Sequence, residues 1–200
     1  MKKIGLLGGS FNPIHTGHLL LAESARCEYQ LDKIIFIPTG SNPFKENIKK
    51  IRRKDRMNMV KLAIASNPFF DISDIEIKRE GKSYTIDTIN ELSQQYKDAE
   101  FYFITGADIM FEITRWREAE TLLRNVTFVT SFRPGYSHKK LDQQIEKLKA
   151  EYNTKILKLI SSEMDIASSD IRNRIKENRS YKYLIPESVE AYIKEHHLYQ

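Results

Sequence analysis

The sequence near the N-terminus reads Lys3-Ile4-Gly5-Leu6-Leu7-Gly8-Gly9-Ser10-Phe11-Asn12-Pro13-Ile14-His15-Thr16-Gly17-His18. Residues 3–7 form a short apolar run that glycines close, which predicts a buried strand. Gly8 and Gly9 allow the backbone to turn close to a phosphate. His15 and His18 are three positions apart, where helical spacing of apolar residues begins over 18–30. Their rings would share one face of a first helical turn, beside the helix N-terminus, and could donate hydrogen bonds to a polyphosphate.

The rest of the chain alternates between strand and helix patterns. Further strands are predicted over 33–38, 71–78, 100–105, 125–130 and 155–160, and a polar loop over 39–51. Helices are predicted over 53–66, 85–95, a region reaching about 123, 139–152, 169–177 and 186–196, with Pro186 at the first helical position. This alternation predicts one α/β domain over 1–200, a Rossmann-like doubly wound parallel sheet, with a small C-terminal helical extension over about 166–200.

Two more motifs follow predicted strands, where ligands bind in such sheets. In 166–172, Ser168 or Ser169 can act as the helix N-cap, and Arg172 adds a planar cationic fork. Alone, this motif fits a capped helix with a surface arginine, but its place at the edge that carries the histidines favours an anion site. In Gly106-Ala107-Asp108, the aspartate could accept from a ribose hydroxyl. Trp116 downstream offers a stacking face, although alone it fits a core role better than a ligand contact.

Composition narrows the class of protein. The 200 residues are 40% hydrophobic, without the run of roughly 20 apolar residues that a membrane span requires. A single cysteine, Cys27, excludes an intrachain disulfide and is compatible with a reducing, cytoplasmic location; we expect it to be a small core residue. The net charge of +5 favours anionic partners, either phosphorylated metabolites or nucleic acid. The basic cluster at 49–54 is more typical of a solvated face than of a nucleic-acid site.

A zinc site at His15 and His18 is a weaker alternative. Structural and catalytic zinc sites need three or four protein ligands, and no cysteine or acidic cluster near the histidines supplies the others.

Together the motifs resemble those of the bacterial nicotinate mononucleotide adenylyltransferases, within the nucleotidylyltransferase superfamily. The superfamily pattern G-x-F-x-P-x-H-x-G-H matches residues 9–18, and its late pattern I-S-S-T-x-I-R matches 166–172. Segments 79–88, 106–116 and 183–199 match the nicotinate enzymes more specifically, so the resemblance covers essentially the whole chain. Two departures are visible: Ala167 and Ser169 replace the usual serine and threonine, and 42–45 lack the histidine that commonly precedes Lys45.

The resemblance implies transfer of AMP from ATP to nicotinate mononucleotide, which gives nicotinate adenine dinucleotide and pyrophosphate in NAD biosynthesis. It implies Mg²⁺ that is held mainly by the ATP phosphates, without a protein metal ligand. It also implies that neither nucleic acid nor a membrane is a partner. A homo-oligomer is possible, and the oligomeric state stays open. The implied catalytic residues are His15, His18 and Arg172. The implied ATP-binding residues are these three with Gly8, Gly9, Ser10, Phe11, Gly106, Asp108, Ile109, Arg133, Ser168, Ser169 and Ile171. The implied substrate-binding residues are Lys45, Tyr84, Thr85 and Trp116.

Two other functions fit parts of the sequence. One is a related adenylyl- or cytidylyltransferase, such as one acting on phosphopantetheine, against which segment 83–88 and Trp116 argue. The other is a basic nucleic-acid-binding protein, which would need stacking aromatics interleaved with basic residues on one surface.

Overall fold

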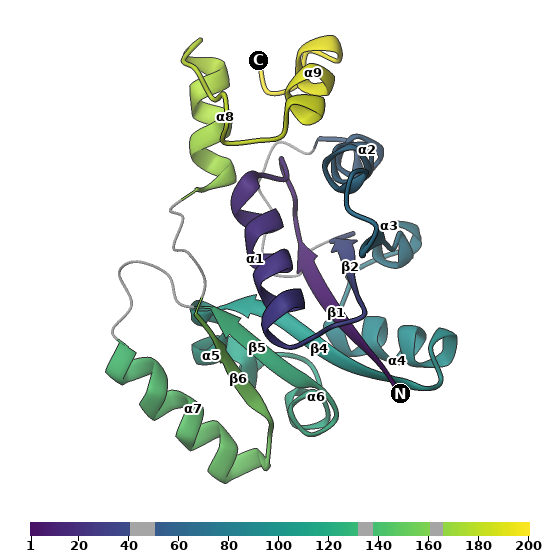
Figure 1. The fold of residues 1–200 in the computed structure, drawn as a ribbon, viewed down its shortest axis with the longest axis vertical. Coiled ribbons are helices and arrows are strands. Elements are labelled where there is room, and N and C mark those ends of the chain that lie inside the picture. Colours follow the sequence, from purple (N-terminus) through teal and green to yellow (C-terminus); the bar gives the residue numbers. More distant parts are fainter. Residues whose placement is uncertain (41–50, 132–137, 161–165) are drawn as a thin grey trace.

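A six-stranded parallel sheet forms the centre of the molecule (Figure 1). The computed structural model describes residues 1–40, 51–131, 138–160 and 166–200. The strands lie in the order β3-β2-β1-β4-β5-β6, which is the doubly wound α/β arrangement that the sequence predicts. The strands are β1 (Lys2–Gly9), β2 (Lys33–Pro38), β3 (Phe70–Ile72), β4 (Ala99–Gly106), β5 (Thr127–Ser131) and β6 (Ile156–Leu159).

Helices cover both faces of this sheet. The α-helices are α1 (Thr16–Glu28), α2 (Arg53–Ile64), α3 (Ile75–Lys78), α4 (Thr85–Gln95), α5 (Ala107–Glu112), α6 (Ala119–Asn125), α7 (His138–Tyr152), α8 (Ser168–Lys176) and α9 (Glu187–Glu195), with a 3₁₀ turn, η1, over Ile113–Arg115. Residues from α1, α2, α8 and α9 form one apolar core, and residues from α3 to α7 form the other. Because both faces of the sheet are buried, its strands are apolar almost throughout.

The strand order places two predicted motifs side by side. From β1 the chain first adds strands on one side, β2 and then β3, and continues with β4 on the other side, so the strand order has its switch point between β1 and β4. Leu6 of β1 pairs with Phe103 of β4, and each lies three residues before the end of its strand. Gly9 and Gly106 therefore end neighbouring strands at the same edge of the sheet. A crevice at such a switch point is where ligands bind in open α/β sheets.

The predicted strand over 71–78 is wrong in its second half. Only Phe70–Ile72 pair with β2, and residues 75–78 form α3 instead. The Ser73 N–H donates to the Phe36 carbonyl, and the Ile75 N–H then donates to Ser73 Oγ, so the chain turns away from the sheet. Apolar and polar residues alternate again over 75–78, but β3 is a short strand at the edge of the sheet, and the hydrogen bonds of Ser73 end it after Ile72.

Two smaller expectations are also wrong. Pro186 is the N-cap of α9 and not its first helical residue. Cys27 is exposed, since the buried residues of α1 are Ala22 and Ala25, which lie on another side of the helix.

The C-terminal helices lie together at one end of the molecule, with the C-terminus beside them (Figure 1). Helix α9 contacts α2, and the Asn58 side chain donates to the Tyr192 hydroxyl across this contact. Within the described ranges, no helix is long and apolar enough to cross a membrane.

Candidate active site

The turn between β1 and α1 carries the two histidines. His15 is the N-cap of α1 and is buried, whereas His18, one turn further, is half-buried. Their rings stack with centroids 3.6 Å apart and an interplanar angle of 27°. The structure therefore brings the pair together at the N-terminal end of a helix, where anions are stabilised.

A backbone hydrogen bond indicates which ring nitrogen of a neutral His18 carries the proton. The His15 backbone N–H donates to His18 Nδ1 at 3.2 Å. A ring nitrogen that accepts a hydrogen bond carries no proton, so the neutral imidazole keeps its proton on Nε2. His18 thus has a defined donor at the far side of its ring, which suits a phosphate oxygen.

The Phe11 side chain packs against the ring of His18. Its ring is 1% exposed and meets the His18 ring edge-on, with centroids 5.0 Å apart. A Cβ added at Gly9 would lie 3.0 Å from the Phe11 ring, so the glycine lets the ring approach the backbone closely. The predicted contact of Phe11 with ATP stays a prediction, because what the structure shows is its packing against His18.

Helix α8 meets this turn directly. Arg172 Nη1 donates to the Asn12 carbonyl at 2.8 Å, and Ser168 Oγ donates to the Pro13 carbonyl at 2.9 Å. The first and last motifs of the sequence, about 160 residues apart, thus form one site. The N-cap prediction is wrong: Ala167 is the N-cap, and the Ser168 hydroxyl bonds across to the turn because Pro13 presents a carbonyl there. Ser169 is exposed in the first turn of α8.

Ile171 lies behind this junction. Its side chain is fully buried in the core, and its backbone N–H donates to the Ala167 carbonyl. The residue thus anchors α8 to the sheet, and its predicted contact with ATP stays a prediction.

The end of β4 forms the neighbouring wall. Gly106 is the N-cap of α5, and Asp108 and Ile109 are half-buried in its first turn. Asp108 is thus at the sheet edge that carries the histidine turn, where a carboxylate can accept from a ribose hydroxyl.

The predicted substrate residues also come together. Tyr84 is the N-cap of α4, and Thr85 is the first residue of that helix. The Arg117 guanidinium lies 5.0 Å from the centroid of the Tyr84 ring, and Trp116 packs edge-on against Phe103 of β4. Segments 83–85 and 116–117 therefore lie side by side, next to the strand that ends at Gly106. Ser83, the first residue of segment 83–85, is 6% exposed, and its hydroxyl has no hydrogen-bond partner among the described residues.

Lys45 and Arg133 fall outside the described residues, so their predicted contacts stay predictions. Gly8 lies near the end of β1, where it pairs with Ile37 of β2, and Ser10 is the first residue after that strand.

Arg56 is a site residue that the sequence analysis missed. It is 8% exposed, and its guanidinium donates to the Ser10 carbonyl at 2.7 Å and to the Thr39 carbonyl at 2.6 Å. Burial lowers its pKa from the usual arginine value. Arg56 therefore ties the exits of β1 and β2 together. A signal was available, since Arg56 occupies the apolar stripe of α2 with Val60 and Ala63, where a charge is unusual.

Gly40 follows β2 and is linked through Glu76 to α4, the helix that begins at the predicted substrate residues Tyr84 and Thr85. The N–H of Gly40 bonds to the carboxylate of Glu76, which is buried, and burial raises the pKa of that carboxyl. The carboxylate of Glu76 also accepts from the Thr88 hydroxyl of α4 at 2.9 Å. A Cβ added at Gly40 would collide with the Glu76 carbonyl and lie 2.8 Å from Ser83 Oγ.

We expect Gly40→Ala to destabilise the protein by about 1–3 kcal/mol, because a backbone carbonyl cannot move aside without shifting α3. Urea unfolding measures this loss. Gly8→Ala is the matched control, since a Cβ at Gly8 meets only Phe103, at an ordinary 3.8 Å. Equal stabilities for the two variants would contradict the packing described at Gly40.

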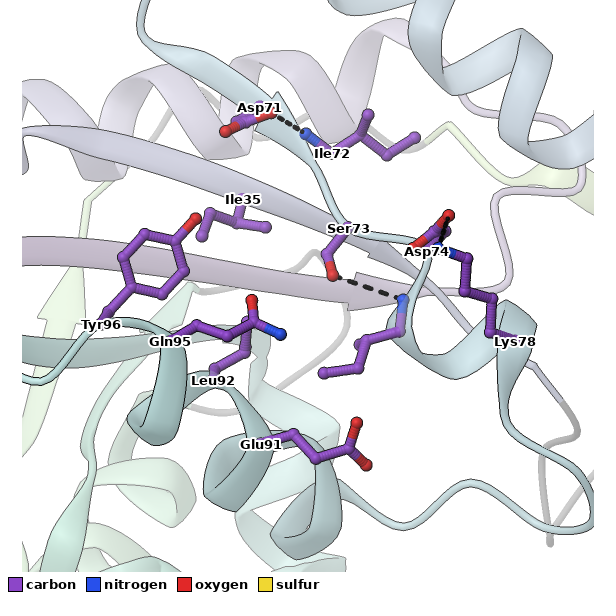
Figure 2. A pocket seen from close by; sticks show the side chains of 11 residues that line it. Ile35, Asp71, Ile72, Ser73, Asp74, Lys78, Glu91, Leu92, Gln95 and Tyr96 are labelled. Atoms are coloured by element: carbon purple, nitrogen blue, oxygen red, sulfur yellow. Dashed lines mark hydrogen bonds and ion pairs between the residues drawn. The ribbon is translucent and has the colours of Figure 1, made fainter.

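A separate hollow of about 420 Å³ lies between the β2–β3 edge and helices α3 and α4 (Figure 2). Its three carboxylates are paired with basic side chains: Asp71 with Lys33, Asp74 with Lys78 and Glu91 with Arg79. None of the predicted site residues lines it. Its lining residues are Ile35, Asp71, Ile72, Ser73, Asp74, Ile75, Lys78, Glu91, Leu92, Gln95 and Tyr96.

In the part of the chain that the structure describes, no cluster of three or more histidine, cysteine, aspartate or glutamate side chains is placed to hold a metal ion. The site offers mainly N–H donors and cations, which suit phosphate oxygens.

The chain resembles a known protein family over most of its length. The family model for cytidylyltransferase-like proteins matches residues 6–174, from β1 through the α8 motif. The chain belongs to the cytidylyltransferase-like family. Two curated relatives carry the name "Probable nicotinate-nucleotide adenylyltransferase". The one from Thermoanaerobacter sp. is 45% identical over 99% of this chain and 94% of its own, and the one from Bacillus pumilus is 40% identical over the full length of both.

A solved structure shares the fold of this cytidylyltransferase-like chain. It is the nicotinic acid mononucleotide adenylyltransferase of Plasmodium falciparum complexed with NaAD, with a TM-score of 0.80, 19% identity, and coverage of 100% of this chain and 98% of that one.

Proposed function

We propose that this chain transfers AMP from ATP to nicotinate mononucleotide, giving nicotinate adenine dinucleotide and pyrophosphate. The observation that carries the proposal is the junction of the histidine turn with α8, beside the wall formed by Tyr84 and Trp116. One side of the site offers donors for a triphosphate, and the other offers a helix start and aromatic rings for a second nucleotide. The curated relatives with the corresponding name, at 40–45% identity over nearly the whole chain, support the same reaction.

The ATP phosphates are assigned to the β1–α1 turn and α8. We place His18 at the α-phosphate, with His15 beside it, because the Nε2–H of His18 is its defined donor. Arg172 and the Ser168–Ser169 turn would hold the β- and γ-phosphates, since a guanidinium binds phosphate bidentately. Asp108 would accept from the ribose. Support for this division comes from the hydrogen bonds that join α8 to the turn.

The reaction needs no protein nucleophile. A phosphate oxygen of nicotinate mononucleotide attacks the α-phosphorus of ATP, a new P–O bond forms, and the bond from the α-phosphorus to the bridging β-phosphate oxygen breaks. Pyrophosphate leaves with that electron pair. Catalysis then depends on alignment of the two phosphates and on neutralisation of the charge that develops on the leaving group. Donors that are already fixed by the fold, such as His18 and Arg172, supply this with little reorganisation.

Mg²⁺ is the metal that we propose for the reaction. The described residues provide no carboxylate cage, which fits an ion that keeps its water and binds mainly to substrate phosphates. Bound there, it would neutralise phosphate charge. We also propose that the chain works in the cytoplasm and binds no nucleic acid; a homo-oligomer stays a prediction.

We expect the enzyme to prefer nicotinate mononucleotide over its amide by roughly 10- to 100-fold in kcat/KM. The start of α4, at Tyr84 and Thr85, presents backbone N–H groups and the positive end of the helix dipole. A carboxylate there accepts charge-assisted hydrogen bonds worth about 1.5–3 kcal/mol, whereas the amide turns an NH₂ group toward donors. Initial rates with each nucleotide at saturating ATP give the ratio. Equal values, or a preference for the amide, would show that α4 does not bind the carboxylate.

A further inference from the structure

Four side chains from distant parts of the chain hold the turn between β1 and α1. Arg56 of α2 donates to the Ser10 carbonyl, and Ser168 and Arg172 of α8 donate to the carbonyls of Pro13 and Asn12. The fourth is Tyr199, whose hydroxyl donates to Asn12 Oδ1 at 2.8 Å. The turn that would bind the triphosphate is therefore held by side chains from α2, α8 and the C-terminal tail, in addition to its own backbone bonds.

Tyr199 reaches this position from the C-terminal tail. Its backbone lies in the left-handed region, with φ 68°, which a tyrosine rarely adopts, so the contacts that it makes must offset that cost. Its ring packs against the core that contains α1, α8 and α9. Burial raises the pKa of the phenol, opposed by the neighbouring guanidiniums of Arg172 and Arg56. The hydroxyl therefore stays protonated at neutral pH and acts as a donor to Asn12, near the guanidiniums of Arg172 and Arg56.

Asn12 links Tyr199 to the site. It is 7% exposed, its carbonyl accepts from Arg172 at 2.8 Å, and its side-chain oxygen accepts from Tyr199 at the same distance. Arg172 donates one N–H to the Asn12 carbonyl. Because the guanidinium is planar and rigid, the position of Asn12 therefore sets the direction of the other N–H groups of Arg172. A shift of Asn12 would move Arg172 and the turn together.

We propose that Tyr199 is a positioning residue for adenylyl transfer, holding Asn12 so that Arg172 and the histidine turn face the ATP phosphates. This inference rests on the proposed function. It assigns a task in the active site to the last residue but one of the chain.

Tyr199→Phe tests the proposal, because it keeps the ring and removes only the hydroxyl. We expect kcat with ATP and nicotinate mononucleotide to fall about tenfold, the size of one lost hydrogen bond that acts in the transition state. The KM for nicotinate mononucleotide should stay unchanged, since Tyr199 lies on the ATP side.

Tyr192→Phe is the matched control. The Tyr192 hydroxyl also makes two hydrogen bonds in the C-terminal region, to Asp55 and Asn58 of α2, both away from the turn. The control should lower the melting temperature at least as much as Tyr199→Phe while leaving kcat unchanged. Were Tyr199 merely structural, both variants would lose stability and neither would lose kcat, which would overturn the proposal.

A double-mutant cycle with Asn12→Ala gives a second measurement. If Tyr199 acts through Asn12, Tyr199→Phe should cost little in the Asn12→Ala background, whereas independent effects would multiply and contradict the link. Failure of the proposed function is a separate outcome: the unmodified enzyme would then release no pyrophosphate with nicotinate mononucleotide.

Discussion

His18→Ala is expected to lower kcat by about 100- to 1,000-fold while the fold stays intact. The ring presents its Nε2–H because the His15 backbone N–H occupies Nδ1, at 3.2 Å. Removal of one preorganised donor from the transition state of group transfer typically costs a factor of this size. Steady-state kinetics of the purified variant, with circular dichroism to establish its folding, measure the effect.

His18→Asn separates the two tasks of the ring. The Asn side-chain oxygen can occupy the place of Nδ1 and accept from the His15 backbone, but the shorter side chain has no donor at the position of Nε2. We therefore expect His18→Asn to be nearly as inactive as His18→Ala. Activity restored to near that of the unmodified enzyme would mean that His18 serves only the turn, and a folded His18→Ala enzyme with normal kcat would remove it from the mechanism.

Arg172→Lys should lower kcat/KM for ATP by about 100-fold. The guanidinium donates to the Asn12 carbonyl and has further N–H groups for phosphate, whereas an ammonium is a compact charge that cannot serve both in one plane. Loss of a bidentate charge-assisted contact with phosphate accounts for about 1.5–3 kcal/mol. A lysine that loses the bond to Asn12 would also let the β1–α1 turn shift, which adds to the loss.

Arg174→Lys is the control for this substitution. Arg174 lies on the same helix and bonds to Asp170 and to the Ser180 carbonyl, away from the turn. It should leave kcat/KM unchanged, because a lysine there changes only a half-exposed ion pair with Asp170 and a bond to Ser180, neither of which touches the turn. If Arg172→Lys also left kcat/KM for ATP unchanged, Arg172 would have no role in binding the ATP phosphates, and the prediction would be wrong.

Much of this architecture follows from local patterns. The apolar run at 3–7 and the helical spacing after His15 predict β1 and α1, and motifs that follow parallel strands must share one edge of the sheet. That topological rule predicts the meeting of the histidine turn with Arg172, which the hydrogen bond to Asn12 confirms.

The features that were missed depend on contacts across long stretches of chain. Nothing near Ser168 in sequence shows that its hydroxyl would bond to Pro13 and not cap its own helix. Tyr199 reads as an ordinary aromatic residue of a C-terminal tail until its hydroxyl is seen on Asn12. Residues 75–78 alternate like a strand, and only the bonds of Ser73 show that β3 has already ended.

The central claim is the identity of the phosphate acceptor, and one assay tests it most directly. Purified protein, ATP and Mg²⁺ are mixed in parallel with nicotinate mononucleotide, nicotinamide mononucleotide or phosphopantetheine, and pyrophosphate is followed while the adenylylated product is identified by mass. We predict the fastest release with nicotinate mononucleotide, at one pyrophosphate for each nicotinate adenine dinucleotide formed. Faster release with phosphopantetheine, or none with nicotinate mononucleotide, would contradict the account.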